Sequence, residues 1–163
     1  TQCKFIAGNI LQQRSLSKQL FDVIVCSEVI EHVPDPQKII DFAYKLLKKN
    51  GLIILTTPND PKLWSVLDEY AGHVKRFRVQ DIKHLLSHFT ILRLYTVGFP
   101  FMRIIIRCYD TIVRRTSMKH SASWRQQKIN NMLYAIIVKY LLRFDDLFNA
   151  LLRGTTIIVV AKK

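Results

Sequence analysis

The 163-residue chain has few cysteines, and it has no long uncharged apolar run. Its three cysteines, Cys3, Cys26 and Cys108, are odd in number and far apart, which excludes a disulfide framework and a paired-cysteine metal knuckle and favours a reducing cytoplasm. Arginine or lysine interrupts every apolar stretch before it reaches the roughly 18–20 residues that a bilayer span needs. The sequence therefore argues against a transmembrane protein and against a disulfide-stabilised secreted domain.

Acidic residues are also scarce, since 12 Asp and Glu stand against 25 Lys and Arg, a net charge of +13. The imbalance is concentrated between Arg103 and Lys128, where basic residues face a single acid, Asp110. Such a segment indicates an anionic partner, for which a membrane surface is one candidate. Nucleic acid is the weaker candidate, because the cations alternate with aliphatic residues and lack an aromatic stacking platform.

Short apolar runs at residues 3–7, 21–26 and 52–57 predict three buried strands. Between the last two, Asp35 is expected to cap a helix, Pro36 to occupy its first turn, and Asn50-Gly51 to end it. Strand, helix and strand joined this closely predict a right-handed βαβ unit. The fold class is therefore α/β, with one domain over residues 1–163.

Further elements follow this unit. A helix is expected over residues 79–89, a strand over 90–97 and a last strand in the closing TTIIVVAKK. The intervening residues 99–153 predict a helical insertion. Its first helix carries a narrow polar stripe of Arg103, Arg107, Asp110 and Arg114, and its second has an apolar face within residues 129–148. We expect the insertion to form a lid over the sheet with affinity for a membrane surface.

Residues 26–33, CSEVIEHV, follow directly on a predicted strand. In open α/β sheets ligands bind beyond the carboxyl ends of the strands, where Gly8-Asn9-Ile10 and Thr57–Asp60 are also expected. Glu28, Glu31 and His32 have the spacing i, i+3, i+4, so one helical turn would place them on one face and could hold a divalent cation. The alternatives are that these three residues line a pocket or cap a helix, and of the three roles the metal site is the least favoured.

The run FDVIVCSEVIEHVPDPQKIIDFAYKLLKKNGLIILTTPN, residues 21–59, resembles the middle of a class I S-adenosylmethionine-dependent methyltransferase of the type 11/12 kind. The resemblance implies a Rossmann-like sheet whose last strand is antiparallel. It also implies that the N-terminal strands and the glycine-rich cofactor loop precede Thr1, so we expect a C-terminal portion that is inactive alone.

The resemblance further implies which positions contact S-adenosylmethionine: Asn9, Ile10, Cys26, Ser27, Glu28 and Val29. Asn9 and Ile10 would contact the adenine, which Val29 would help to enclose, although most members of the family have an acid where this chain has Asn9. Cys26, Ser27 and Glu28 would lie along the methionine part of the cofactor and face the acceptor.

Catalytic roles are expected for His32, His73 and Glu28. A hydroxyl acceptor benefits from a base with a pKa near neutrality, which favours His32 and His73. For His73 a structural hydrogen bond with Asp81 or the backbone is the alternative. Quinone-pathway O-methyltransferases have a similar Glu-x-x-Glu-His turn, which makes Mg²⁺ at Glu28, Glu31 and His32 an option.

The sequence thus favours methyl transfer to a small or lipid-linked acceptor, such as a glycan or isoprenoid intermediate. A non-catalytic membrane or partner-binding module of the same fold is the first alternative. A dinucleotide-dependent oxidoreductase is the second, and the direction of the final strand separates it from a methyltransferase.

Overall fold

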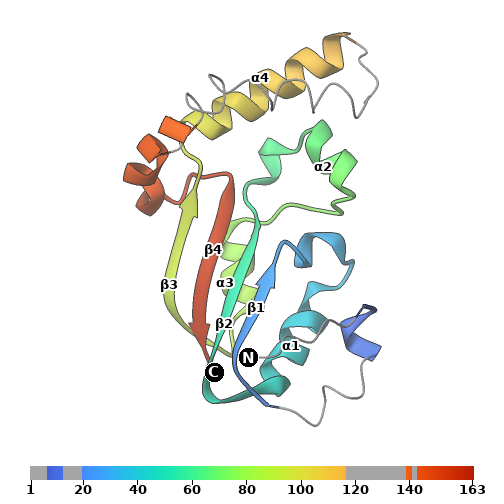
Figure 1. The fold of residues 1–163 in the computed structure, drawn as a ribbon, viewed down its shortest axis with the longest axis vertical. Coiled ribbons are helices and arrows are strands. Elements are labelled where there is room, and N and C mark those ends of the chain that lie inside the picture. Colours follow the sequence, from blue (N-terminus) through green and yellow to red (C-terminus); the bar gives the residue numbers. More distant parts are fainter. Residues whose placement is uncertain (1–6, 13–19, 117–138, 141–142) are drawn as a thin grey trace.

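The computed structural model describes residues 7–12, 20–116, 139–140 and 143–163. Its centre is a four-stranded sheet in the order β1-β2-β4-β3 (Figure 1). The strands are β1 (Phe21–Ser27), β2 (Leu47–Pro58), β3 (Thr90–Val97) and β4 (Thr156–Lys162). β1 pairs with β2 in parallel, whereas β4 is antiparallel to both β2 and β3. The predicted α/β class and the antiparallel last strand are therefore confirmed.

The crossover from β1 to β2 is α1 (Pro36–Leu46), which has Pro36 in its first turn as predicted. Asp35 stands at the N-cap without a capping hydrogen bond from its side chain, which is paired with Lys38 instead. The prediction that Asn50-Gly51 ends this helix is wrong. Leu47, which is buried, already pairs with Phe21 in the sheet, so the helix ends before it. Asn50 lies in a bulged part of β2 with a φ of 65°.

The remaining described elements are short except for α4, which has 16 residues. They are the 3₁₀ helices η1 (Ile10–Gln12), η3 (Ile30–His32), η4 (Pro61–Leu63) and η5 (Asp146–Leu151), and the α-helices α2 (Val66–Ala71), α3 (Val79–Leu85) and α4 (Phe101–Thr116). The helix expected over 79–89 thus ends at Leu85. The strand expected at 3–7, except for its last residue, and most of the helix expected within 129–148 fall outside the described residues.

The core lies between the sheet and the pair α1 and α3. Ile53 and Leu55 of β2 and Ile157 and Val159 of β4 are fully buried in the same cluster as side chains of these two helices. Burying one such side chain contributes about 1.5–3 kcal/mol. On β1, by contrast, Val25 is 63% exposed.

α4 follows β3 in the chain and is the first helix of the insertion predicted before the last strand. It lies beyond the end of the sheet where β1 and β2 terminate (Figure 1). Two ion pairs fix it to the segment after β2: Arg103 with Asp60 at 2.6 Å and Arg114 with Glu69 at 2.9 Å. Two members of the polar stripe therefore face acids of this chain. Among the described residues, no helix combines the length and apolar character that crossing a membrane requires.

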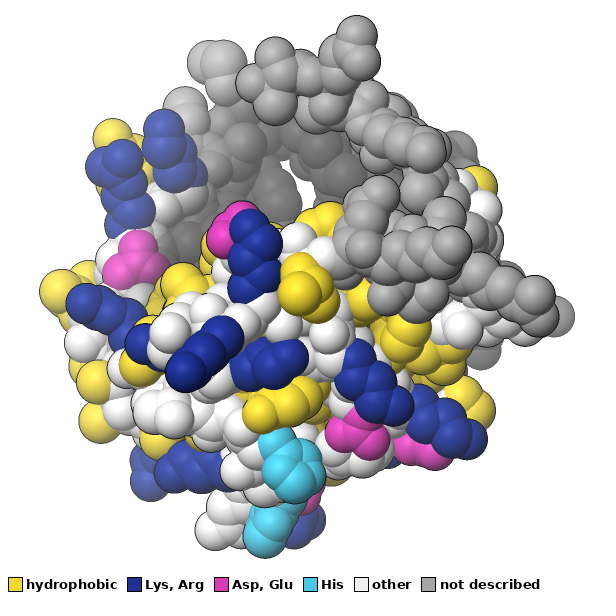
Figure 2. Space-filling model, turned by 90° about the horizontal axis from the view of Figure 1, so that it is seen from below, with side chains coloured by type: hydrophobic (Ala, Val, Ile, Leu, Met, Phe, Trp, Pro, Cys, Tyr) yellow, Lys and Arg dark blue, Asp and Glu magenta, His cyan; other side chains and the backbone are white. Residues whose placement is uncertain are grey.

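The excess of basic side chains does not form one continuous surface in the view from below the sheet. Figure 2 shows Lys and Arg dispersed over this face among apolar and uncharged side chains. Dispersed cations of this kind are solvated and raise solubility without defining a binding site. A site for an anion must therefore be sought where cations converge.

Candidate active site and cation site

The turn after β1 places the acidic and imidazole side chains of CSEVIEHV. Glu28 has a φ of 51°, and its N–H donates to the carbonyl of Thr56 on β2 at 3.1 Å. A non-glycine residue in the left-handed region is strained, and such residues concentrate at functional sites. The chain then enters η3, where fully buried Ile30 fixes the turn against the core. Glu31 and His32 follow from this anchor.

Glu31 is the buried carboxylate at the centre of the site, with 0% of its side chain exposed. Its Oε2 accepts a hydrogen bond from the Thr57 hydroxyl at 3.0 Å. Its Oε1 is buried and has no hydrogen-bond partner among the described residues. Leaving a buried carboxylate oxygen unsatisfied is costly, so this atom is suited to bind a cation or a hydrogen-bond donor.

Two imidazoles face this oxygen. His32 Nδ1 lies 3.2 Å from the carbonyl oxygen of Gly72, which assigns the proton to Nδ1 and leaves Nε2 free to accept, 4.0 Å from Glu31 Oε1. His73 Nδ1 lies 2.9 Å from Asp68 Oδ1, which assigns the same tautomer. The two rings meet edge to face with their centroids 4.8 Å apart. Glu31, His32 and His73 each offer a ligating atom, and these atoms lie within 4.8 Å of one another.

Asp68 holds His73 in place and is itself held firmly. Arg76 donates to it from Nε at 2.7 Å and from NH2 at 3.0 Å, and Ser65 donates from its N–H and its hydroxyl. Burial raises the pKa of Asp68, but the hydrogen bonds from Arg76 and His73 outweigh burial and hold it below the usual range. The carboxylate therefore stays ionised and orients the His73 ring, as carboxylates do behind metal-binding histidines.

Glu28 belongs to a second hydrogen-bonded chain, next to Glu31 and His73. The Thr56 hydroxyl donates to Glu28 Oε1 at 2.9 Å, so the Ser27 hydroxyl, 2.9 Å from Thr56 Oγ1, is the donor to Thr56. Burial raises the pKa of Glu28, the Thr56 hydroxyl opposes the shift, and the charge of Glu31 raises the pKa further. Glu28 is thus a carboxyl group that takes up a proton more readily than a free one.

The other predicted contact residues are spread more widely. Cys26 is buried at the end of β1, and burial, followed by the charge of Glu31, raises the pKa of its thiol to about 11. Val29 is exposed at the start of η3. Asn9 Oδ1 accepts the N–H of Leu11 at 3.0 Å, and the turn that holds Asn9 and Ile10 lies beside α1, away from the carboxyl end of β1 (Figure 1). The structure does not bring Asn9 and Ile10 to the Cys26–Val29 segment.

The candidate donor set that the structure groups differs from the one predicted from the sequence. The sequence suggested Glu28, Glu31 and His32, whereas the structure groups Glu31 and His32 with His73. The unpartnered Glu31 Oε1 and two acceptor nitrogens fit a divalent cation. One carboxylate and two imidazoles suit Zn²⁺ or Fe²⁺ better than Mg²⁺, which prefers oxygen ligands.

Comparison with known proteins decides the family. A family model described as a methyltransferase domain matches residues 6–89, just over half of the chain. The chain belongs to this methyltransferase-domain family. The ubiquinone biosynthesis O-methyltransferase of Psychrobacter arcticus is 51% identical over 100 residues, which are 58% of this chain and 39% of that protein. The chain thus spans well under half of this relative, and the predicted resemblance is confirmed.

Two solved structures share the methyltransferase fold. Phosphoethanolamine N-methyltransferase 2 of Haemonchus contortus, in complex with S-adenosylmethionine, has a TM-score of 0.50 at 17% identity over 88% of this chain and 33% of that one. The [4+2]-cyclase SpnF has a TM-score of 0.50 at 14% identity over 89% of this chain and 51% of that one. One fold therefore carries different reactions, and the site must decide between them.

Sequence reasoning did not group Asp68 and Arg76 with His73 in this candidate site. The hydrogen bond predicted between His73 and Asp81 is absent, because Asp81 instead accepts the Arg78 N–H at the start of α3. The partner of His73 is Asp68 instead. Ser65 and Asp68 have the Ser-x-x-acid spacing of a capping box, which is the one signal that could have located this carboxylate.

Proposed function

We propose that this chain takes part in the transfer of a methyl group from S-adenosylmethionine to a hydroxyl of a small molecule. The observation that carries the proposal is the 100-residue match, at 51% identity, to a protein named as an O-methyltransferase. The cluster of Glu31, His32 and His73, with Glu28 in the turn after β1, supports it, because the end of the parallel strands is where this class of sheet binds ligands.

Ser27 and Glu28 are proposed to line the boundary between cofactor and acceptor, with Cys26 and Val29 beside them. The raised pKa of the Cys26 thiol keeps it protonated, so it serves as an apolar wall and not as a nucleophile. For Asn9 and Ile10 the proposed adenine contact requires their turn to move from its place beside α1.

The reaction asks mainly for alignment, since the sulfonium already activates the methyl group. The bond from sulfur to the methyl carbon breaks as the bond from the acceptor oxygen to that carbon forms, and the hydroxyl proton passes to a base. Glu28, with its raised pKa, is the proposed base. His73, whose Nδ1 is held by Asp68, has only Nε2 left, so it is either a second base or a cation ligand but not both at once. A divalent cation held by Glu31, His32 and His73 would lower the pKa of an acceptor hydroxyl.

A phenolic precursor of a quinone is the acceptor class that the named relative suggests. An acceptor linked to an isoprenoid fits the apolar side of α4, where Ile104 is 54% exposed. The insertion over residues 99–153 is proposed as a lid, because α4 is tied by Arg103 and Arg114 to the segment after β2. Peripheral attachment to an anionic membrane through α4 then rests on Arg107 more than on these two paired arginines.

Methyl transfer is tested with the protein expressed from its complete reading frame, S-adenosylmethionine and a catechol acceptor. His73→Ala and Glu28→Gln should each reduce kcat by about 10²–10⁴-fold if these groups act as bases. His84→Ala is the matched control, since His84 is an exposed histidine on α3 outside the cluster, and it should leave kcat unchanged. Absence of S-adenosylmethionine binding in calorimetry would support the non-catalytic module instead.

The cation is tested separately by titrating the metal-free protein with Mg²⁺ and with Zn²⁺. The donor set predicts tighter binding of Zn²⁺, and Glu31→Gln or His73→Ala should weaken it at least tenfold. A preference for Mg²⁺ that depends on Glu28 and not on His73 would restore the donor set predicted from the sequence. Equal binding by all variants would exclude a cation from this site.

A further inference from the structure

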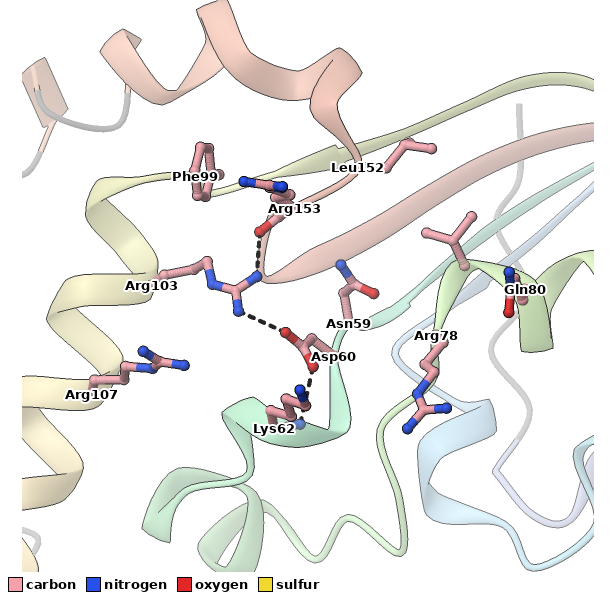
Figure 3. A pocket seen from close by; sticks show the side chains of 11 residues that line it. Asn59, Asp60, Lys62, Arg78, Gln80, Phe99, Arg103, Arg107, Leu152 and Arg153 are labelled. Atoms are coloured by element: carbon pink, nitrogen blue, oxygen red, sulfur yellow. Dashed lines mark hydrogen bonds and ion pairs between the residues drawn. The ribbon is translucent and has the colours of Figure 1, made fainter.

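A cavity of about 640 Å³ lies beside the segment that follows β2. Its walls come from η4, from the start of α3, from α4 and from the loop before β4 (Figure 3). None of the residues that line it belongs to the Glu31, His32 and His73 cluster. The volume falls within the range of pockets that hold small molecules.

Basic side chains from four segments converge on this cavity: Lys62, Arg78, Arg103, Arg107 and Arg153. Asp60 is the one acid among the lining residues. In Figure 3, Arg107 from α4 and Arg78 from the start of α3 lie on opposite sides of Asp60 and Lys62. This convergence contrasts with the dispersed cations of Figure 2.

Asp60 neutralises one of these cations. Its Oδ2 accepts from Arg103 NH2 at 2.6 Å and its Oδ1 from the Lys62 N–H at 3.1 Å. Burial raises the pKa of Asp60, but the Lys62 N–H and Arg103 hold it below the usual range, so Asp60 is ionised. Arg103 is fixed further by donating from NH1 to the carbonyl of Arg153 at 2.7 Å.

Four cations remain: Lys62, Arg78, Arg107 and Arg153. Within the part of the chain that the structure describes, none of the four forms an ion pair. Like charges gathered around one cavity repel, and a bound anion removes that repulsion. A surplus of four charges favours a ligand with more than one negative charge over a single carboxylate.

We propose that this cavity binds a phosphate-bearing ligand. Guanidinium groups present forked donors that match phosphate oxygens, and three of the four unpaired cations are arginines. The Phe99 and Leu152 side chains supply an apolar wall for the carbon part of such a ligand. The phosphate belongs either to a soluble ester or to the headgroup of an anionic phospholipid.

Hydrogen bonds connect the cavity to the candidate active site, although the two have no residue in common. Arg76 NH1 donates to the carbonyl of Asn59 at 3.1 Å, and the same guanidinium holds Asp68 behind His73. Asn59 lines the cavity, and its own side chain is fixed by donating to the carbonyl of Gly154 at 2.7 Å. A ligand here would therefore sit against a rigid wall shared with the site.

The test titrates the full chain with inorganic phosphate and pyrophosphate in chloride buffer by calorimetry. Saturable binding is expected, tighter for pyrophosphate. Arg107→Ala and Arg153→Ala should each raise Kd about tenfold, the effect of losing one charge-assisted hydrogen bond. Arg115→Ala is the matched control, because this exposed arginine of α4 lies outside the cavity, and it should change Kd less than about twofold. Circular dichroism of each variant checks that the fold is retained.

Vesicles of phosphatidylglycerol, with phosphatidylcholine vesicles as reference, distinguish the two sources. Co-sedimentation that free pyrophosphate reverses and that Arg107→Ala weakens assigns the cavity to a lipid headgroup. Pyrophosphate binding without co-sedimentation assigns it to a soluble phosphate ester. The proposal is overturned if neither anion binds saturably, or if Arg115→Ala weakens binding as much as Arg107→Ala does.

Discussion

Replacing Asp68 by Asn is the substitution whose effect follows most directly from the structure. The Asp68 side chain is 0% exposed and accepts five hydrogen bonds, from Ser65, His73 and Arg76. Asn preserves the shape but removes the charge, which leaves the Arg76 guanidinium, 6% exposed, without its counter-ion. Breaking a buried ion pair in this way costs about 3–5 kcal/mol. For a chain of this size we expect Tm to fall by roughly 6–20 °C.

Urea unfolding followed by circular dichroism measures this cost. Asp81→Asn is the matched control, because Asp81 is an exposed carboxylate that accepts one backbone N–H at the start of α3. Asn keeps an acceptor there, so this replacement should cost less than about 1 kcal/mol. If Asp68→Asn costs no more than Asp81→Asn, Asp68 does not hold the site together and the reasoning is wrong.

The pH dependence of Asp68 has a definite sign. Its native pKa lies below the ordinary value of 3.8, so its stabilising contribution is present above that value and is lost as the pH falls through the native pKa. Asp68→Asn removes this group, so the variant should lose less of its remaining stability below pH 3.8 than the wild type does. Parallel acid unfolding of the two proteins would contradict the assignment.

Two further predictions concern reactivity and backbone strain. At pH 8 iodoacetamide should label exposed Cys108 and spare buried Cys26, because the raised pKa of Cys26 leaves it about a hundredfold less thiolate than a thiol with the ordinary pKa of 9.0. Labelling of Cys26 should rise only as the pH approaches 11. Mass spectrometry of the peptides measures both, and equal labelling of the two cysteines at pH 8 would contradict the prediction. Thermal unfolding should show that Gly98→Ala destabilises the protein more than Gly72→Ala does. Both glycines have a positive φ, but a Cβ at Gly98 would lie 2.5 Å from Thr155 Oγ1, whereas a Cβ at Gly72 would meet nothing within 4 Å. Equal losses would show that strain and not this clash governs Gly98.

The sequence predicted the βαβ unit because its signals are local. Pro36 marks the start of α1, and apolar residues at helical spacing mark its buried face. The end of α1 was predicted too late, since the pairing of Leu47 with Phe21 is a contact between strands that spacing along one helix does not show. The antiparallel final strand was known only through the resemblance.

The candidate site could be predicted only in part, for the same reason. Spacing grouped Glu28 with Glu31 and His32 on one helical turn, but the positive φ of Glu28 turns its side chain to Thr56. His73 takes the remaining place, from a loop 41 residues beyond His32. A long-range contact of this kind depends on how α2 packs and leaves no local pattern in the sequence.

The polar stripe of α4 shows how a correct pattern can support an incomplete interpretation. The helix and its stripe are present, yet Arg103 and Arg114 are paired with Asp60, Asp110 and Glu69. From the sequence alone we predicted that these cations bind a membrane surface, because the sequence could not show which acids the fold places beside them. Arg107, which lines the cavity, is the member of the stripe that remains for a ligand.

The central claim is that the cluster after β1 and β2 serves methyl transfer to a hydroxyl. Its most direct test is the transfer of a radiolabelled methyl group from S-adenosylmethionine to a catechol by the protein expressed from its complete reading frame, with Glu31→Gln as the comparison. We predict labelled product with the wild type and a loss of at least tenfold with Glu31→Gln, whose Oε1 is the unpartnered atom at the centre of the site. Labelled product at equal rates from both proteins, or none from the wild type together with no cofactor binding, would contradict the account.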